Sequence, residues 1–251
     1  MAKNFIIERL KIDFKDREDI SRRELFAFYQ QFEPDLKETT FRWRIHDLKA
    51  KKIISIRSRE MFSMAYKPIF KPEVGENERE TYIKISEQFS GLRCCIWSTK
   101  IVKEFMLHIP GRFLTIVQVE KEALEPVYDF LREQKFGPVF IQPEGKEIER
   151  YIYETESTII LQSLISKSPT QKVDTIPTIT LEKMLVDIYC DKKLFAAFNG
   201  SELIHIINNA HSRYSIDFTK LLSYAKRRRR EVDILEFLST KTNIPKSVLN
   251  D

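Results

Sequence analysis

The sequence predicts an α+β protein, in which an N-terminal winged helix-turn-helix precedes a small mixed α/β domain that ends in a helical segment. Three observations indicate this fold class. Apolar residues recur at helical spacing over most of residues 3–52, and a short hairpin-like stretch follows directly. Strand-like and helix-like runs alternate from residue 78, and the pattern is entirely helical from residue 180. We therefore divide the chain into a winged-helix domain (1–70), a linker (71–78) and an α/β domain with a helical C-terminal part (79–251).

Two helices are expected at the start of the first domain. The first covers residues 3–12, where apolar side chains gather on one side. The second covers residues 22–32, because Ser21 is a good N-cap and Glu24, three residues later, completes a capping box. The Pro34–Asp35 pair then predicts a turn.

A third helix is expected over residues 37–52. Phe41, Ile45 and Leu48 fall on one side of it at helical spacing, so we expect them to face the core. The remaining surface presents short polar and aromatic side chains bordered by long cations. These candidate DNA-binding residues are Thr39, Thr40, Arg42, Trp43, Arg44, His46, Lys49 and Lys51.

This distribution is typical of a recognition helix, whose outer face meets base edges while flanking cations reach phosphates. Two questions stay open from sequence. Arg42 and Arg44 could contact phosphates, or they could read guanine edges, which accept bidentate arginine hydrogen bonds. Trp43 could stack on a sugar or a base, or it could dock on the second domain.

A two-stranded hairpin is expected directly after the third helix. Residues 53–57 and 61–66 form its strands, and residues 58–60 form its tip. Arg57 and Arg59 would then lie near the minor groove or the phosphate backbone, which adds both to the candidate DNA-binding residues. Three helices followed by such a hairpin describe a winged helix.

Positive charge is concentrated in the same region. Residues 37–72 contain six lysines and four arginines against three acids, a net charge of +7, whereas the whole chain carries +5. One strongly basic region in an otherwise nearly neutral chain is typical of a protein that binds nucleic acid. Two other interpretations remain: a charged helix face that is only solvated, and a winged helix that docks a protein partner.

The second domain is expected to be a small sheet flanked by helices. Strands are predicted at 93–97, 113–119, 139–142 and 158–161, and helices at 80–89, 98–107, 120–134, 180–190, 201–211, 218–228 and 231–239. Pro126 is expected to kink the helix in which it lies.

Five cations follow one another at the end of a predicted helix: Lys226, Arg227, Arg228, Arg229 and Arg230. Consecutive positions encircle a helix, so this basic run must lie at an exposed end. It could pair with the negative end of the helix dipole, or it could form an auxiliary phosphate contact.

Composition excludes several classes of protein. No apolar run approaches the roughly 20 residues that a membrane span requires, so no membrane association is expected. The three cysteines, Cys94, Cys95 and Cys190, have no spacing typical of a disulfide framework, which favours reduced thiols and a cytoplasmic protein. The adjacent pair is expected to be buried in a strand.

The motifs of common active sites are missing, so we expect no enzyme, no cofactor and no metal. The sequence has no glycine-rich phosphate loop and no nucleophile elbow, and its histidines have no metal-ligand spacing. The weak exception is Glu144-x-Lys146 after a predicted strand, because Mg²⁺-dependent nucleases combine acids with a lysine. A cryptic nuclease is therefore retained as an alternative.

Residues 179–191 and 214–239 resemble the C-terminal part of AbiEi-type proteins, the winged-helix antitoxins of type IV toxin–antitoxin and abortive-infection systems. The first matching segment is Leu181–Asp187, and the second contains Asp217, Leu221, Tyr224, Ala225 and Arg227 or Arg228. Residues 95–123 are similar to an uncharacterised bacterial branch of the same architecture. The chain departs from the family at the hairpin tip, which lacks the usual glycine.

The resemblance implies a repressor that binds the operator of its own operon in double-stranded DNA. Its functional partner would be a nucleotidyltransferase-like toxin, without stable direct contact. We therefore expect a DNA-binding transcriptional regulator that acts as an antitoxin. The alternatives are a protein-interaction adaptor that uses the winged helix for docking, and the cryptic nuclease.

Overall fold

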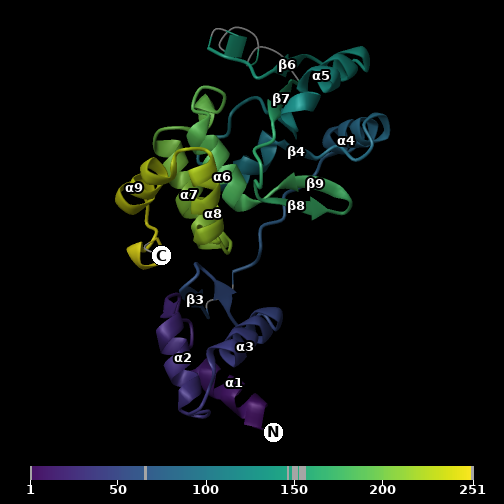
Figure 1. The fold of residues 1–251 in the computed structure, drawn as a ribbon. Helices are drawn as coiled ribbons and strands as arrows, with labels where there is room; N and C mark the ends of the chain where they lie inside the picture. The colour runs from purple at the N-terminus through teal and green to yellow at the C-terminus, as the bar shows by residue number, and fades with distance from the viewer. Residues whose placement is uncertain (1, 65–66, 146, 149–151, 153–156, 250–251) are drawn as a thin grey trace.

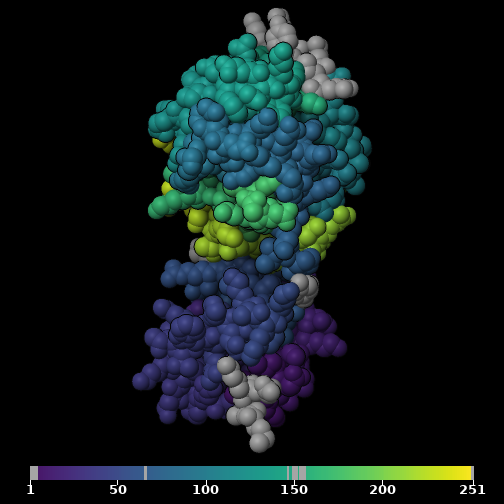
Figure 2. All heavy atoms as spheres, turned by 90° about the vertical axis from the view of Figure 1, so that its right-hand side faces the viewer, coloured from purple at the N-terminus to yellow at the C-terminus, as the bar shows by residue number. Residues whose placement is uncertain are grey.

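The computed structural model describes residues 2–64, 67–145, 147–148, 152 and 157–249, with residues 2–4 described through their backbone only. The chain forms two lobes (Figure 1). One lobe holds the first three helices and a small sheet, and the other holds a larger sheet and the C-terminal helices. In the space-filling view the N-terminal lobe stands below the other as a separate mass (Figure 2). The protein is α+β, as predicted.

The N-terminal lobe, which we call the module (residues 2–64), consists of α1 (Ala2–Asp13), β1 (Ile20–Ser21), α2 (Arg22–Gln30), α3 (Glu38–Ala50), β2 (Ser55–Ile56) and β3 (Met61–Ser63). Strand β3 pairs antiparallel with both other strands, in the order β1-β3-β2. The three predicted helices and the predicted hairpin are all present in the module. Strand β1 was not predicted, since two residues are too few to show alternation.

The start of α2 follows its predicted chemistry. The Ser21 hydroxyl accepts a hydrogen bond from the Glu24 amide at 3.1 Å, and the Glu24 carboxylate accepts one from the Ser21 amide at 2.8 Å. Both halves of the capping box are therefore formed. These bonds explain why the pKa of Glu24 lies below its usual value: the side-chain bond from Ser21 is the largest cause and the backbone bond the next.

The predicted rotational phase of α3 is confirmed. Phe41, Ile45 and Leu48 are buried, and they pack in one hydrophobic cluster with Leu25 of α2 and Phe62 of β3. With these apolar positions turned inward, the polar and basic positions of α3 must face outward.

The second lobe is built on a four-stranded sheet in the order β4-β5-β7-β6. Its strands are β4 (Cys94–Ser98), β5 (Thr115–Val119), β6 (Val139–Ile141) and β7 (Ile159–Ser163). Strand β4 is antiparallel to β5, whereas β5, β7 and β6 are mutually parallel. All four strands lie within or close to their predicted ranges.

Helices cover both faces of this sheet. Cys95 and Trp97 pack with the C-terminal helices, whereas Cys94 and Ile96 pack with α4 (Glu76–Gln88) and α5 (Leu124–Glu133). Burial on both faces explains why these strands read as continuous apolar runs. Both adjacent cysteines are buried, as predicted.

Two predicted helices differ in detail. Residues 99–105 form a 3₁₀ helix, η1 (Thr99–Phe105), although Ser98 caps its first turn as expected. The predicted helix over 120–134 is a short 3₁₀ turn, η2 (Lys121–Ala123), followed by α5. Pro126 falls in the first turn of α5, where a missing amide hydrogen costs nothing, so the expected kink is wrong.

The C-terminal helices form a layer against the sheet (Figure 1). They are α6 (Leu181–Cys190), α7 (Ser201–Arg213), α8 (Phe218–Arg227) and α9 (Glu231–Lys241), with short 3₁₀ turns η4 (Ala196–Phe198) and η5 (Lys246–Val248). A hairpin of β8 (Thr170–Val173) and β9 (Ile176–Ile179) was not predicted. Strand β8 is mostly polar, so it gave no apolar alternation.

The segment between the lobes is anchored to the second one. Phe70 is buried against the rings of Phe105 and Tyr214, at centroid distances of 5.7 and 5.2 Å. The carbonyl of Pro68 accepts a hydrogen bond from the Ser215 amide at 3.0 Å. The predicted linker of residues 71–78 is shorter than expected, since α4 already begins at Glu76.

Of the helices that the structure describes, none combines the length and the apolar character that crossing a membrane would demand.

Candidate nucleic-acid interface

The outer face of α3 carries most of the predicted DNA-binding residues in exposed positions. The exposed set comprises Thr39, Thr40, Arg42, Trp43, His46, Lys49 and Lys51, together with Arg59 at the hairpin tip. Because α3 holds the first six of these and Lys51 follows it directly as the C-cap, their relative positions are fixed by the backbone. The structure therefore brings most of the predicted surface together.

Trp43 is the most conspicuous residue of this face, since 73% of its surface is exposed. Its ring makes an edge contact with the imidazole of His46, with 5.8 Å between centroids. Both residues line a shallow hollow on α3 that ends at Ala50. Such exposure means that Trp43 does not dock on the second lobe.

Arg44 is less available than its neighbour Arg42. Its guanidinium donates to the Glu33 carboxylate at 2.7 Å, and both side chains are largely covered. Lys51 pairs with Asp47 one turn earlier at 3.0 Å but remains exposed. Arg42 is therefore the better placed of the two arginines for reading a base.

Arg57 corrects the sequence prediction. Only 1% of its side chain is exposed, so it cannot lie against a DNA backbone in this structure. The hairpin packs on the start of α8: the Phe218 amide donates to the Arg57 carbonyl at 2.9 Å, and the Arg59 amide donates to the Thr219 hydroxyl at 3.0 Å. Burial lowers the pKa of Arg57, which the Glu18 carboxylate, 3.9 Å away, partly opposes.

His211 lies at the same contact between the lobes. Its backbone carbonyl accepts a hydrogen bond from the Lys67 ammonium at 2.8 Å, and Lys67 also approaches Glu18 at 3.5 Å. Burial, followed by the nearby charges of Lys67 and Arg57, lowers the pKa of His211 to about 4. The imidazole is therefore neutral at physiological pH.

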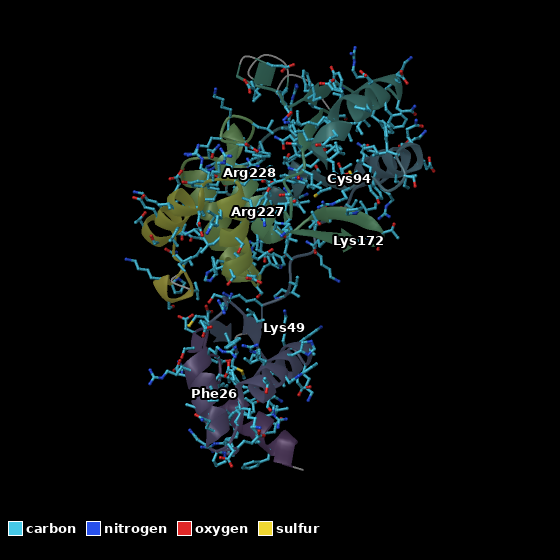
Figure 3. The ribbon with its side chains drawn as sticks, viewed as in Figure 1. Phe26, Lys49, Cys94, Lys172, Arg227 and Arg228 are labelled. Carbon is cyan, nitrogen blue, oxygen red and sulfur yellow. The ribbon has the colours of Figure 1, made fainter. Side chains whose placement is uncertain are left out.

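The basic run divides into four exposed residues and one, Arg228, that is mostly covered. Lys226, Arg227, Arg229 and Arg230 are exposed, and Arg230 pairs with Asp233 at 2.8 Å. Arg228 corrects the prediction of a five-residue patch, because its guanidinium turns inward to Asp187 and Asp191 at 3.0 and 2.8 Å. Figure 3 shows Arg227 and Arg228 on the helical layer, whereas Lys49 lies at the end of α3 nearest that lobe.

A buried ionic network lies behind Arg228, and the sequence did not reveal it. The Lys183 ammonium, with no exposed surface, lies 2.5 Å from the Asp187 carboxylate. The Tyr224 hydroxyl donates to Asp187 at 2.7 Å and accepts from Lys183 at 3.0 Å. Burial raises the pKa of Tyr224, and the Asp187 charge raises it further. The available signal was a lysine and an aspartate four residues apart in a helix that is otherwise largely apolar.

The four residues of this network belong to residues 179–191 and 214–239, the two segments whose resemblance to a known family was described above. Lys183 and Asp187 come from the first segment, and Tyr224 and Arg228 from the second. Their mutual contacts give the paired segments a structural role: the network locks α6 to α8.

A cavity of about 550 Å³ lies near this network, at the carboxyl ends of β6 and β7. Cys190 and Asp191 line it, beside Lys192 and Lys193. Burial raises the pKa of Cys190 to about 11, so its thiolate is scarce at neutral pH and a nucleophilic role is disfavoured.

The structure describes the nuclease-like Glu144-x-Lys146 pattern only in part. Glu144 borders the cavity, but Lys146 lies outside the described residues. Within the described ranges, no group of three His, Cys, Asp or Glu side chains is arranged to hold a metal ion.

Comparison with curated proteins gave no match. A family model matches residues 40–244, which run from the first turn of α3 to beyond the end of α9. The match therefore includes the hairpin, the contact between the lobes and the buried network. Since it covers most of the chain, the protein belongs to the family described as a family of unknown function (DUF6577).

Proposed function

We propose that the protein is a DNA-binding transcriptional regulator whose α3 enters the major groove of a duplex. The observation that supports this most is the outer face of α3, where Arg42, Trp43 and His46 are all exposed. The major groove admits a helix, and its base edges accept hydrogen bonds from arginine. The net charge of +7 over residues 37–72 supplies attraction for phosphates.

The salt dependence of binding to DNA tests this proposal. The probes are the fragment upstream of the protein's own gene and a shuffled fragment of equal length. If about five cations contact phosphates, log K should fall with log salt at a slope of about −4.5. Failure to retard either fragment at low salt, or a flat salt response, would reject DNA binding.

Arg42→Ala and Arg44→Ala form a matched pair for the same assay. Arg42→Ala should weaken specific binding by about 1–3 kcal/mol if the side chain reads a base. Arg44→Ala should affect DNA binding less, because Glu33 already holds its guanidinium at 2.7 Å. Lys121→Ala, in η2 directly before α5 of the second lobe, serves as a control outside the module.

The antitoxin role is the finer part of the proposal, and it is supported by the resemblance of residues 179–191 and 214–239 to AbiEi-type proteins. It predicts that a gene for a nucleotidyltransferase-like toxin lies beside the gene for this protein. It also predicts repression of a reporter fused to the upstream fragment, relieved by Arg42→Ala. A neighbouring gene of another class, together with an unrepressed reporter, would reject this role.

A protein-interaction adaptor is the second candidate, and the exposure of Trp43 favours it. Besides contacting DNA, an exposed aromatic side chain in a hollow is typical of the centre of a protein–protein interface. Trp43→Ala should then abolish partner binding. Partner binding by the wild-type protein should depend little on salt. The cryptic nuclease remains the third candidate, and it requires Mg²⁺-dependent DNA cleavage that Glu144→Ala removes.

A further inference from the structure

The hairpin of the module occupies an unexpected place. In the expected winged helix its tip would be free to touch DNA, but here Arg57 and Arg59 bond through their backbones to the first turn of α8. The next residue of that turn, Lys220, is exposed. The second lobe therefore stands beside the hairpin, on the side of the module where α3 ends.

A groove of about 270 Å³ lies between the lobes at this point, which we call the interlobe groove. Lys49 and Lys52 line it from the end of α3, and Lys67 and Lys220 line it from the other side. Ala50 lines both this groove and the hollow that contains Trp43. The outer face of α3 and the interlobe groove thus form one continuous surface.

Charge on the groove walls is predominantly positive. Among the residues that the structure describes, its lining includes four lysines and two acids, Glu182 and Asp217. Both acids already accept backbone hydrogen bonds: Glu182 from the Asp217 amide at 3.2 Å, and Asp217 from the Lys220 amide at 2.9 Å. The side chains of Lys49, Lys52 and Lys220, by contrast, are exposed.

The groove is not purely ionic. Ile56 and Ile69 contribute apolar surface, and 74% of Ile69 is exposed. A sugar–phosphate backbone presents the matching combination of charged phosphates and apolar sugar edges. Its phosphates would meet the lysines while its sugars lie against the isoleucines.

We propose that the interlobe groove binds one strand of the sugar–phosphate backbone of the duplex whose major groove α3 enters. This inference rests on the proposed function. It assigns Lys52 and Lys220 as phosphate contacts, and it gives the second lobe the contact that the hairpin tip would otherwise make. A phosphate contact fixes the position of the duplex without reading its sequence.

Lys220→Gln tests the inference, with Lys220→Arg as the variant that keeps the charge. Loss of one phosphate contact should reduce the salt slope by about 0.9. Lys220→Gln should weaken binding of the upstream and shuffled fragments by the same factor, and Lys220→Arg should restore it. Lys121→Gln, which removes an exposed charge far from the groove, should leave slope and affinity unchanged.

The outcomes separate this inference from the proposed function. If Arg42→Ala weakens specific binding as expected while Lys220→Gln and Lys52→Gln keep the wild-type slope, the groove assignment is wrong and the function of α3 stands. If the wild-type protein shows no salt-dependent binding, both are wrong. An unchanged melting temperature for Lys220→Gln ensures that a reduced slope reports on contact and not on misfolding.

Discussion

The outer face of α3 and the α6–α8 network both gather charged side chains, but in opposite surroundings. On α3, Arg42 and Lys49 are exposed to solvent. In the network, Lys183 and Asp187 are almost fully buried and lie 2.5 Å apart. Water screens the first group, so its charges contribute little to stability and are available to a ligand. The second group is shielded from water, so each charge depends on its partner.

One of the two largest effects on stability is expected at Asp187. Asp187→Ala leaves the Lys183 ammonium buried without its carboxylate, which should lower the free energy of unfolding by about 3–5 kcal/mol. Chemical denaturation followed by circular dichroism measures this loss. Asp233→Ala, which removes an exposed acid, is the control and should change stability by about 0–1 kcal/mol. Equal losses in the two variants would contradict the assignment of a buried network.

The adjacent residues Phe41 and Arg42 should separate folding from binding on α3. Phe41→Ala truncates a fully buried ring and should destabilise the module by about 3–5 kcal/mol. Arg42→Ala should leave stability within about 0.5 kcal/mol, because its side chain is exposed. Thermal melting and DNA retardation of the two variants provide the comparison. A stable Phe41→Ala protein would contradict the packing of α3.

The contact between the lobes should be sensitive to pH through His211. The pKa of His211 is lowered from 6.5 to about 4 in the folded protein, so between these values the unfolded chain takes up a proton that the folded protein excludes. Its contribution to stability is therefore fully present above pH 6.5 and is lost as the pH falls towards 4.

Melting temperatures of the wild-type protein and His211→Gln, measured from pH 7.5 to 4.5, test this expectation. The variant should lose less stability over that interval, since glutamine does not titrate. Parallel curves for the two proteins would show that the imidazole is accessible to protons in the folded state.

The smallest effect is expected for Arg57→Met. Both terminal nitrogens of Arg57 are buried without a hydrogen-bond partner among the described residues, and Glu18 is 3.9 Å away. Methionine keeps the apolar stem and removes the buried charge, so stability should change by less than about 1 kcal/mol or increase. DNA binding should also be unchanged. A loss of affinity for DNA with unchanged stability would show that Arg57 takes part in DNA binding.

The local chemistry of the module could be predicted closely. The Ser21–Glu24 capping box and the inward phase of Phe41, Ile45 and Leu48 depend on residues within a few positions of one another. The strands of the main sheet were also found, because burial on both faces leaves continuous apolar runs. The β8–β9 hairpin was missed, since its polar strand has no such pattern.

The exposure of the candidate residues was predicted correctly where it depends on one helix, and wrongly where it depends on contact between segments. Eight of the ten candidate residues are exposed. Arg57 is buried where the hairpin meets α8, which lies some 160 residues later in the chain, and Arg44 is paired with Glu33. Arg228 looked like its basic neighbours, but the acids that pair with it are on α6.

The amino-acid sequence by itself determined the helices, their caps, the strands with continuous apolar runs and the concentration of positive charge near α3, because each follows from spacing along the chain. Tertiary structure alone decided which cations are free and which are paired, since burial and ion pairing join residues far apart in sequence. It also decided that the hairpin meets α8 and that Lys220 stands near the end of α3.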